Sequence, residues 1–201
     1  MGFYTRRRAT GRQHLARVRG PVILVANHGS HLDTPVILAA LPRRMRKRTV
    51  VAAATDYFYR NRLVAMLVSV VFNTVPLDRC GGGLDRSAAG HVDGLLDRGW
   101  NLLLYPEGTR SRNGEAGQLR RGAAVLAARH RMPIVPIRLT GTRDAMPPGR
   151  FWPSRKHGRL VSTRHLVSIS FGKPIPPTDD THDAIRSVQQ FFEDMAESNG
   201  D

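Results

Sequence analysis

Short apolar runs separated by polar, turn-forming segments dominate this chain. Runs rich in Val, Ile and Leu that are bounded by Gly, Pro or Asn are typical of strands buried on both faces. Between these runs lie segments in which apolar positions recur at helical spacing. The predicted strands are residues 21–26, 49–53, 73–76, 101–105, 134–139 and 166–171, and the predicted helices are residues 35–41, 60–70, 85–98, 122–130 and 183–197.

The alternation of strands and helices predicts an α/β fold with a largely parallel central sheet flanked by helices. At 201 residues, the chain is long enough for one such domain over residues 1–201 without disulfide bonds. We expect a catalytic core over about residues 20–175, a basic segment before it at residues 1–20, and a closing amphipathic helix at residues 181–198. In open α/β sheets ligands bind beyond the carboxyl ends of the strands, so we expect the site in the segments that follow the predicted strands.

The segment after the first predicted strand, Asn-His-Gly-Ser-His-Leu-Asp, places His28 and Asp33 five positions apart. In a regular helix five residues turn roughly 140°, so these two side chains meet only if the chain bends. Gly29 and Ser30 permit that bend, and Pro35 favours a helix start just beyond it. A histidine held by a carboxylate is the arrangement that activates a hydroxyl, with the carboxylate fixing the imidazole tautomer.

Two other interpretations of this segment stay open at this stage. His28, His31 and Asp33 could ligate a metal ion, although the sequence shows no clustered set of further candidate ligands. A histidine at a helix start can also have a purely structural role. We expect a catalytic pair and no bound metal.

A second apolar run ends in Tyr105 and continues as Pro-Glu-Gly-Thr-Arg-Ser. With the first segment it resembles the glycerolipid acyltransferase family of the lysophosphatidic-acid acyltransferase type. That family's signature is Asn-His, four residues and Asp, followed later by Phe-Pro-Glu-Gly-Thr-Arg-Ser, and the chain departs from it only in Tyr105. Two further family blocks match residues 72–79, which end in Arg79, and the Val-Pro block at residues 134–137.

The four blocks follow the family's order over residues 22–139. The resemblance implies a glycerol-phosphate acyltransferase-like fold and transfer of a fatty acyl group from acyl-coenzyme A or acyl-carrier protein to lysophosphatidic acid, giving phosphatidic acid. It also implies that Arg79, Glu107 and Gly108 bind the glycerol phosphate of the acceptor. Because a carboxylate repels phosphate, we interpret Glu107 as orienting an arginine or the hydroxyls of the acceptor.

The chemistry of the residues supports phosphate binding independently. Guanidinium groups at Arg79 and Arg110 are able to bind phosphate oxygens bidentately. Gly108 lets the backbone approach a ligand closely, and Thr109 adds a hydroxyl donor. For both arginines an exposed loop position without function stays open, because arginine is frequent throughout the chain.

The nucleophile is predicted from what the sequence lacks. No Gly-x-Ser-x-Gly motif occurs, and the single cysteine, Cys80, lies outside the four blocks. We therefore expect the acceptor's own hydroxyl to attack the thioester in a ternary complex, without an acyl-enzyme intermediate and without a cofactor. Transfer to a different lipid or to a glycoside hydroxyl stays open, as does a catalytically degenerate protein that binds lipid or nucleic acid.

The formal net charge of +15 indicates an anionic partner. Basic residues cluster at residues 6–8, 43–48 and 150–159, and such clusters are attracted to anionic membrane surfaces and to nucleic acid. Aromatic residues are few and no nucleic-acid-binding signature occurs, so we expect the membrane and no nucleic acid. That 28 of the 31 basic residues are arginine is also consistent with a coding bias.

Cysteine usage and hydropathy predict the location. One cysteine fits a reducing compartment, and no secretory segment occurs at the start. The longest apolar stretch, residues 63–72, is about half the length that a spanning helix needs. We therefore expect a peripheral protein at the cytoplasmic face of the membrane, with no transmembrane segment in this chain.

Three further segments carry expectations. The apolar residues of 63–71 repeat at helical spacing and are expected to pack in the core, with contact to lipid or to an acyl channel as the alternative. Residues 141–164 are rich in Pro, Gly and basic residues and are expected to form a mobile surface loop or lid. Only 27 residues, mostly polar, precede His28, so the apolar helical pair common in the family is not expected here. Two interpretations stay open: a chain cut from a longer protein, and a chain that works beside a partner.

Overall fold

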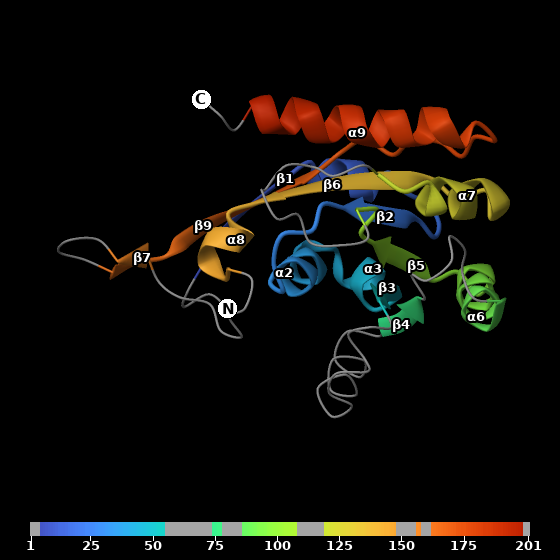
Figure 1. Ribbon diagram of the computed structural model, residues 1–201, viewed down its shortest axis with the longest axis horizontal. Helices are drawn as coiled ribbons and strands as arrows, with labels where there is room; N and C mark the ends of the chain where they lie inside the picture. Colours follow the sequence, from blue (N-terminus) through green and yellow to red (C-terminus); the bar gives the residue numbers. More distant parts are fainter. Residues whose placement is uncertain are drawn as a thin grey trace.

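A computed structural model describes residues 5–54, 74–77, 86–107, 119–147, 156–157 and 162–198. In it a seven-stranded sheet carries helices on both faces (Figure 1). The strands of the sheet are β1 (Thr5–Thr10), β2 (Ile23–Ala26), β3 (Thr49–Ala54), β4 (Thr74–Leu77), β5 (Asn101–Leu104), β6 (Ile134–Thr140) and β9 (His165–Phe171), and β7 (Lys156–His157) pairs with β8 (Ser162–Thr163). The described helices are α1 (Arg12–Ala16), α2 (Asp33–Ala40), α3 (Arg43–Arg46), α6 (Arg86–Asp97), α7 (Gly122–Arg129), α8 (Thr142–Ala145) and α9 (Thr181–Glu197).

The sheet has the strand order β1-β9-β6-β2-β5-β3-β4, and each neighbouring pair is parallel except β6 with β9. The prediction of a largely parallel sheet is therefore confirmed. Strand β2 lies between β5 and β6, with Ile23 opposite both Leu102 and Ile134. Because these three strands are parallel, their carboxyl ends meet at one edge of the sheet. That edge is where the sequence predicts the site.

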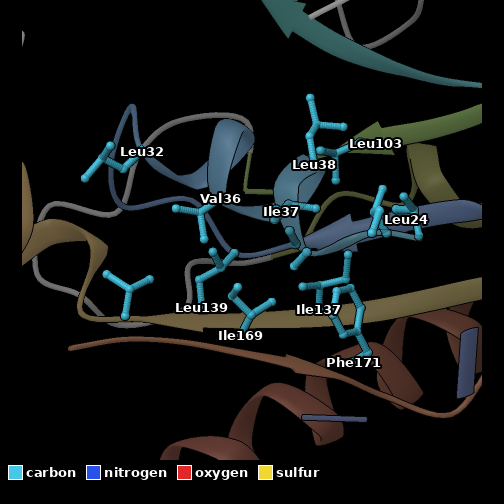
Figure 2. Packing of buried hydrophobic residues seen from close by; sticks show 14 of the residues in the cluster. Leu24, Leu32, Val36, Ile37, Leu38, Leu103, Ile137, Leu139, Ile169 and Phe171 are labelled. Carbon is cyan, nitrogen blue, oxygen red and sulfur yellow. The ribbon is translucent and has the colours of Figure 1, made fainter. Parts of the chain in front are cut away.

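Strand β2 is buried on both faces, as its unbroken apolar run predicts. Its alternate side chains enter two different cores. Leu24 and Ala26 pack with α2, β6 and β9, and Figure 2 shows part of this cluster around Leu24, Ile137 and Phe171. Ile23 and Val25 pack on the opposite face against α6, α7 and α9. At about 1.5–3 kcal/mol per fully buried aliphatic side chain, this two-sided burial holds β2 and the turn that follows it in place.

The predicted elements are confirmed wherever the structure describes them. The six predicted strands and the helices 35–41, 85–98, 122–130 and 183–197 appear with ends displaced by at most two residues. The helix predicted at residues 60–70, and the packing predicted for residues 63–71, lie outside the described residues. No helix in the described ranges combines the length and the apolar character that crossing a bilayer requires.

Two regions differ from the prediction. The first is the basic segment at residues 1–20, which supplies β1 at the sheet edge and α1, whose Leu15 is buried in the core. The run of arginines in β1 hides the strand from pattern reading, because all three are exposed and only its partner β9 makes the strand form. The second is the loop expected at residues 141–164, which begins as helix α8 with Ala145 and Met146 buried. Residues 148–155 and 158–161 of that loop lie outside the described residues.

Candidate active site

The segment predicted to bend does so directly after β2. Asn27 extends the pairing of β2 with β6, since its side-chain amide donates to the Leu139 carbonyl (3.0 Å) and its side-chain oxygen accepts from the Leu139 N–H (2.7 Å). His28 follows at the carboxyl end of the strand, and helix α2 begins at Asp33. Helix α2 therefore starts two residues before the proline that was expected to open it. Pro35 lies in the first turn, where a missing N–H costs nothing.

His28 and Asp33 meet across this turn. His28 Nδ1 lies 2.8 Å from Asp33 Oδ2. The same oxygen accepts hydrogen bonds from the backbone N–H groups of Gly29 (2.7 Å) and Ser30 (2.8 Å). An oxygen that accepts two backbone N–H groups is an acceptor for the ring as well, so Nδ1 carries the proton and donates. The predicted bend and the predicted contact are both present.

The carboxylate of Asp33 is fully buried. Two features of the backbone offset part of the cost of burying it: the N–H groups of the turn, and its place in the first turn of α2, where the helix dipole favours negative charge. Its second oxygen, Oδ1, is buried and has no hydrogen-bond partner among the described residues. A buried carboxylate whose direct ring partner is one imidazole stabilises positive charge on that imidazole.

The imidazole is left with one reactive nitrogen. Since Nδ1 donates to Asp33, Nε2 of the neutral ring carries the lone pair and is the atom able to take a proton. The His28 side chain is 21% exposed, while that of Asp33 is 0% exposed. The pair therefore combines a partly exposed imidazole that can accept a proton with a buried carboxylate on the other side of the ring. This is the arrangement of a general base.

Tyr105, directly after β5, supports the ring of His28 from one side. The two rings stack with centroids 4.2 Å apart and planes inclined by 22°. The Tyr105 hydroxyl shares a 2.7 Å hydrogen bond with Thr34 Oγ1, one residue after Asp33. Burial, and then the negative charge of Asp33, raise the pKa of the Tyr105 phenol well above its usual value, while the bond to Thr34 acts in the opposite direction. The phenol therefore stays neutral and holds both the ring and the helix that carries Asp33.

Glu107 reaches the same place from the end of β5. Its Oε1 accepts a hydrogen bond from the backbone N–H of His28 at 3.3 Å. The pKa of the Arg138 guanidinium lies below its usual value because the group is partly buried. The nearby negative charge of Glu107 opposes this effect. Arg138 lies on β6 with its Cζ 5.9 Å from the ring centroid of Phe192, a residue of α9. The end of β5 therefore contacts the turn after β2 directly, through the bond between Glu107 and the His28 N–H. The negative charge of Glu107 also acts on Arg138 of β6.

Ser30 joins the turn to the segment after β6. Its hydroxyl donates to the Met146 carbonyl (2.8 Å) and accepts from the Leu32 N–H (3.2 Å), and the residue is buried. The chain just beyond α8 is therefore fixed to the catalytic turn. For this stretch the expectation of a mobile lid is wrong.

Among the predicted site residues, His28, Asp33 and Glu107 come together as expected. Arg79, Gly108, Thr109 and Arg110 lie outside the described residues, so their phosphate-binding roles stay predictions. Several side chains that hold the site had no predicted role in its contacts. Most of these side chains lie in or beside the motifs, but their contacts join segments far apart along the chain and could not be predicted from the motifs. The residues are Asn27, Ser30, Thr34, Tyr105 and Arg138.

The structure also bears on the alternative in which His28, His31 and Asp33 ligate a metal ion. The contact of His28 with Asp33 is a hydrogen bond between a ring N–H and an oxygen that already accepts two other bonds. Within the ranges that the structure describes, no group of three His, Cys, Asp or Glu side chains is arranged to hold a metal ion. The geometry is that of an oriented base.

Comparison with known proteins points in the same direction. A family model described as Acyltransferase matches residues 6–140. The chain is 33% identical over 172 residues to the human 1-acyl-sn-glycerol-3-phosphate acyltransferase alpha, covering 84% of this chain and 54% of that protein. It is 28% identical over 145 residues to the chloroplastic 1-acyl-sn-glycerol-3-phosphate acyltransferase BAT2 of Brassica napus, covering 69% of this chain and 38% of that protein. The chain thus spans about half or less of the length of these two relatives.

A solved structure has a similar fold. The crystal structure of the 1-acyl-sn-glycerophosphate acyltransferase PlsC from Thermotoga maritima superposes with a TM-score of 0.69, covering 96% of this chain and 73% of that one. At 21% sequence identity this likeness supports the α/β fold. The family model covers the two segments that meet in the site, the turn after β2 and the end of β5.

Proposed function

Since the chain belongs to the Acyltransferase family, we propose that it is an O-acyltransferase that acts on a lysophosphatidic-acid-type acceptor. It moves a fatty acyl group from the thioester of coenzyme A or of acyl-carrier protein to the free hydroxyl of 1-acyl-glycerol-3-phosphate. The product is phosphatidic acid, a precursor of phospholipids. The relatives named as 1-acyl-sn-glycerol-3-phosphate acyltransferases support this choice of acceptor.

The observation that carries the proposal is the 2.8 Å bond between His28 Nδ1 and Asp33 Oδ2. It leaves Nε2 of His28 free to take the proton of the acceptor hydroxyl as that oxygen attacks the thioester carbonyl. The buried charge of Asp33 stabilises the imidazolium that forms. When the carbon–sulfur bond breaks, the imidazolium returns the proton to the thiolate. The acyl group thus passes directly to the acceptor oxygen, and the thiol leaves protonated.

The remaining groups have proposed roles in holding the acceptor. Arg79 and Arg110 would bind the phosphate through their guanidinium groups, with Gly108 and Thr109 contributing backbone and hydroxyl donors. Glu107 would orient the acceptor's hydroxyls or one of these arginines. Its hydrogen bond to the His28 backbone supports this proposal, because it links the end of β5 to the base.

The proposal also includes the cellular setting. The net charge of +15 supports peripheral association with an anionic membrane surface at the cytoplasmic face, where the lipid acceptor resides. The same charge suits either donor, because coenzyme A and acyl-carrier protein are both anionic.

The test compares thioester consumption by the wild-type protein and by His28→Ala, with lysophosphatidic acid as acceptor. We expect the variant to lose roughly 10²–10⁴-fold in kcat, the usual contribution of a general base. His182→Ala is the matched control, because His182 is an exposed residue in the first turn of α9 whose ring lies 2.8 Å from the Arg121 side chain, outside the His28–Asp33 turn. The control should keep wild-type activity.

Equal activity in wild type and His28→Ala, with both folded by circular dichroism, would contradict the enzyme assignment. A panel of acceptors with one labelled thioester then identifies the substrate. Faster transfer to glycerol 3-phosphate, to another lysolipid or to a glycoside would replace lysophosphatidic acid as acceptor while leaving the chemistry in place. Accumulation of covalently acylated protein during turnover would overturn direct transfer.

A further inference from the structure

Two groups of exposed arginines lie at opposite ends of the sheet. Arg6, Arg7 and Arg8 of β1 are named here the site-end arginines, and Arg43, Arg44 and Arg46 of α3 the far-end arginines. All six side chains are exposed, and none takes part in an ion pair recorded within the described residues. Within the described part of the chain, both groups therefore present positive charge without a paired carboxylate. Their places relative to the candidate site differ.

Strand register places the first group beside the site. Thr140, at the carboxyl end of β6, pairs with Ser168 of β9, and Ser168 pairs with Arg8 of β1. Arg8 is therefore level with the carboxyl end of β6. His28 follows β2, which is three strands from β1, so the lateral separation is roughly 14 Å at about 4.8 Å per strand. The site-end arginines therefore lie near the carboxyl ends of β2 and β6, at the same end of the sheet as His28.

The far-end arginines precede β3, at the amino ends of the parallel strands. Thr49, the first residue of β3, pairs with Asn101, the first residue of β5. In that register the candidate site lies some six residues further along β2, roughly 20 Å away at about 3.3 Å per residue. A flat partner surface that covers the end of the sheet with His28 would therefore not contact the far-end arginines.

The surface around the site-end arginines has a second feature. Leu166 of β9 pairs with Arg6 and is 55% exposed, one of two large hydrophobic side chains recorded as exposed among the described residues. Neither β1 nor β9 contains an acidic residue. Because side chains alternate along a strand, Leu166 shares its face of the sheet with Arg6 and Arg8. An exposed leucine beside arginines suits the boundary of a bilayer, where the leucine enters the acyl region and the guanidinium groups contact the headgroups.

We propose that the edge formed by β1 and β9, with Arg6, Arg7, Arg8 and Leu166, is the surface that docks on an anionic bilayer. This rests on the proposed function, because a lipid acceptor has to enter the site from the bilayer. Docking at this edge turns the carboxyl ends of β2, β5 and β6 toward the lipid. The far-end arginines then contribute to net charge but not to the oriented complex.

The experiment uses two triple variants of equal charge: Arg6→Gln, Arg7→Gln, Arg8→Gln, and Arg43→Gln, Arg44→Gln, Arg46→Gln. Each lowers the net charge by three, so any effect of overall charge is the same in both. Sedimentation with phosphatidylcholine vesicles, with and without phosphatidylglycerol, measures binding in the absence of any thioester. Leu166→Ser tests the apolar contact separately.

We expect the site-end triple variant to bind anionic vesicles roughly 100-fold more weakly, at about fivefold per arginine, and the far-end variant to lose less than about threefold. Leu166→Ser should lose several-fold. Equal losses in the two triple variants, or a larger loss in the far-end variant, would overturn the proposal. So would loss of binding to duplex RNA in the site-end variant with vesicle binding unchanged, since the edge would then serve nucleic acid.

A soluble acceptor separates this proposal from the enzyme assignment. With short-chain lysophosphatidic acid below its micellar concentration, the site-end variant should keep wild-type kcat, because no docking is needed. On vesicles its rate should fall in parallel with binding. Absence of transfer by the wild type to either acceptor would refute the proposed function while leaving the vesicle-binding comparison valid.

Discussion

Two buried polar side chains, Asn101 and Asp33, lie at opposite ends of the same parallel strands. Asn101, at the start of β5, is 4% exposed, and Asp33, beyond the end of β2, is 0% exposed. Asn101 accepts from the Val22 N–H (3.1 Å) and donates to the carbonyls of Met45 (3.2 Å) and Arg48 (3.1 Å). Asn101 thereby ties together segments that are distant in sequence, whereas Asp33 bonds to His28, Gly29 and Ser30 within its own turn.

The difference between them lies in charge and in partners. Asn101 is neutral, and these three bonds join it to backbone groups, so its bonds hold β2, β3 and α3 in register. Asp33 brings a charge into the interior and keeps one oxygen without a hydrogen-bond partner among the described residues. Burying a charge costs stability unless it is well paired. The sheet thus buries a neutral polar group at its amino end, where it serves stability, and a charged group at its carboxyl end, beside the proposed base.

Asp33→Asn should have the largest effect on activity. The amide oxygen still accepts from the turn, but the charge that fixes the tautomer of His28 and stabilises its imidazolium is lost. We expect kcat to fall roughly 10²–10⁴-fold, measured as thioester consumption at saturating acceptor. Thermal unfolding should change little.

Unchanged kcat in this variant would break the contrast between the two ends of the sheet, because the buried charge would then serve the fold alone. A variant that unfolds at ambient temperature would lead to the same conclusion, since it would make Asp33 a stability residue like Asn101.

Asn101→Ala should show the opposite profile. The Val22 N–H loses its side-chain partner in the interior, and an unsatisfied buried group costs about 1–3 kcal/mol. The Met45 and Arg48 carbonyls lose one donor each but still accept from Thr49 and from the Asn101 backbone N–H. We expect the free energy of unfolding to fall by about 1–3 kcal/mol in urea titrations, with kcat per folded molecule within about twofold of wild type. A drop in kcat greater than the unfolded fraction explains would show that the amino end of the sheet also controls the chemistry.

Thr34→Val and Tyr105→Phe should have the smallest effects. Each removes the 2.7 Å bond that ties the end of β5 to α2 but keeps the stacking of Tyr105 on His28. A bond of this kind is worth about 0.5–1.5 kcal/mol, so we expect kcat to fall about 2- to 10-fold with little change in KM. The double variant should be no worse than either single one, because the same bond is lost once.

Additive losses in that double-mutant cycle would show that the two residues act separately. Alkaline unfolding gives a second measurement on Tyr105→Phe. The folded pKa of Tyr105 is raised, so in wild type the phenol ionises in the unfolded chain before it does so in the folded one, and stability is lost as pH rises past about 10. The variant should lack this loss, and identical alkaline transitions would contradict the burial of the hydroxyl.

Much of the fold follows from local pattern. The strand before His28 was predictable because all its residues are apolar, which is typical of a strand with a core on each face. The bend between His28 and Asp33 was predictable from Gly29 and Ser30, whose backbones tolerate it. The placement of Glu107 near His28 also followed, because both residues come after parallel strands.

Other features had no local signal. β1 has exposed arginines where a pattern would need alternation, and it is a strand only because β9 offers an edge to pair with. Tyr105 appeared in the sequence as a small departure from a motif, while in the structure it contacts both His28 and Thr34.

Local segments of the chain were enough to predict the order of strands and helices and the turn that brings His28 to Asp33, because each depends on residues a few positions apart. The family followed from four motif blocks read in order over residues 22–139. The folded chain was needed to show that β2 lies between β5 and β6, that Tyr105 stacks on His28, and that one arginine cluster lies at the site end of the sheet and the other at the far end. Strand order and side-chain contact depend on which surfaces pack best across the whole chain. That global competition leaves no mark on any single segment.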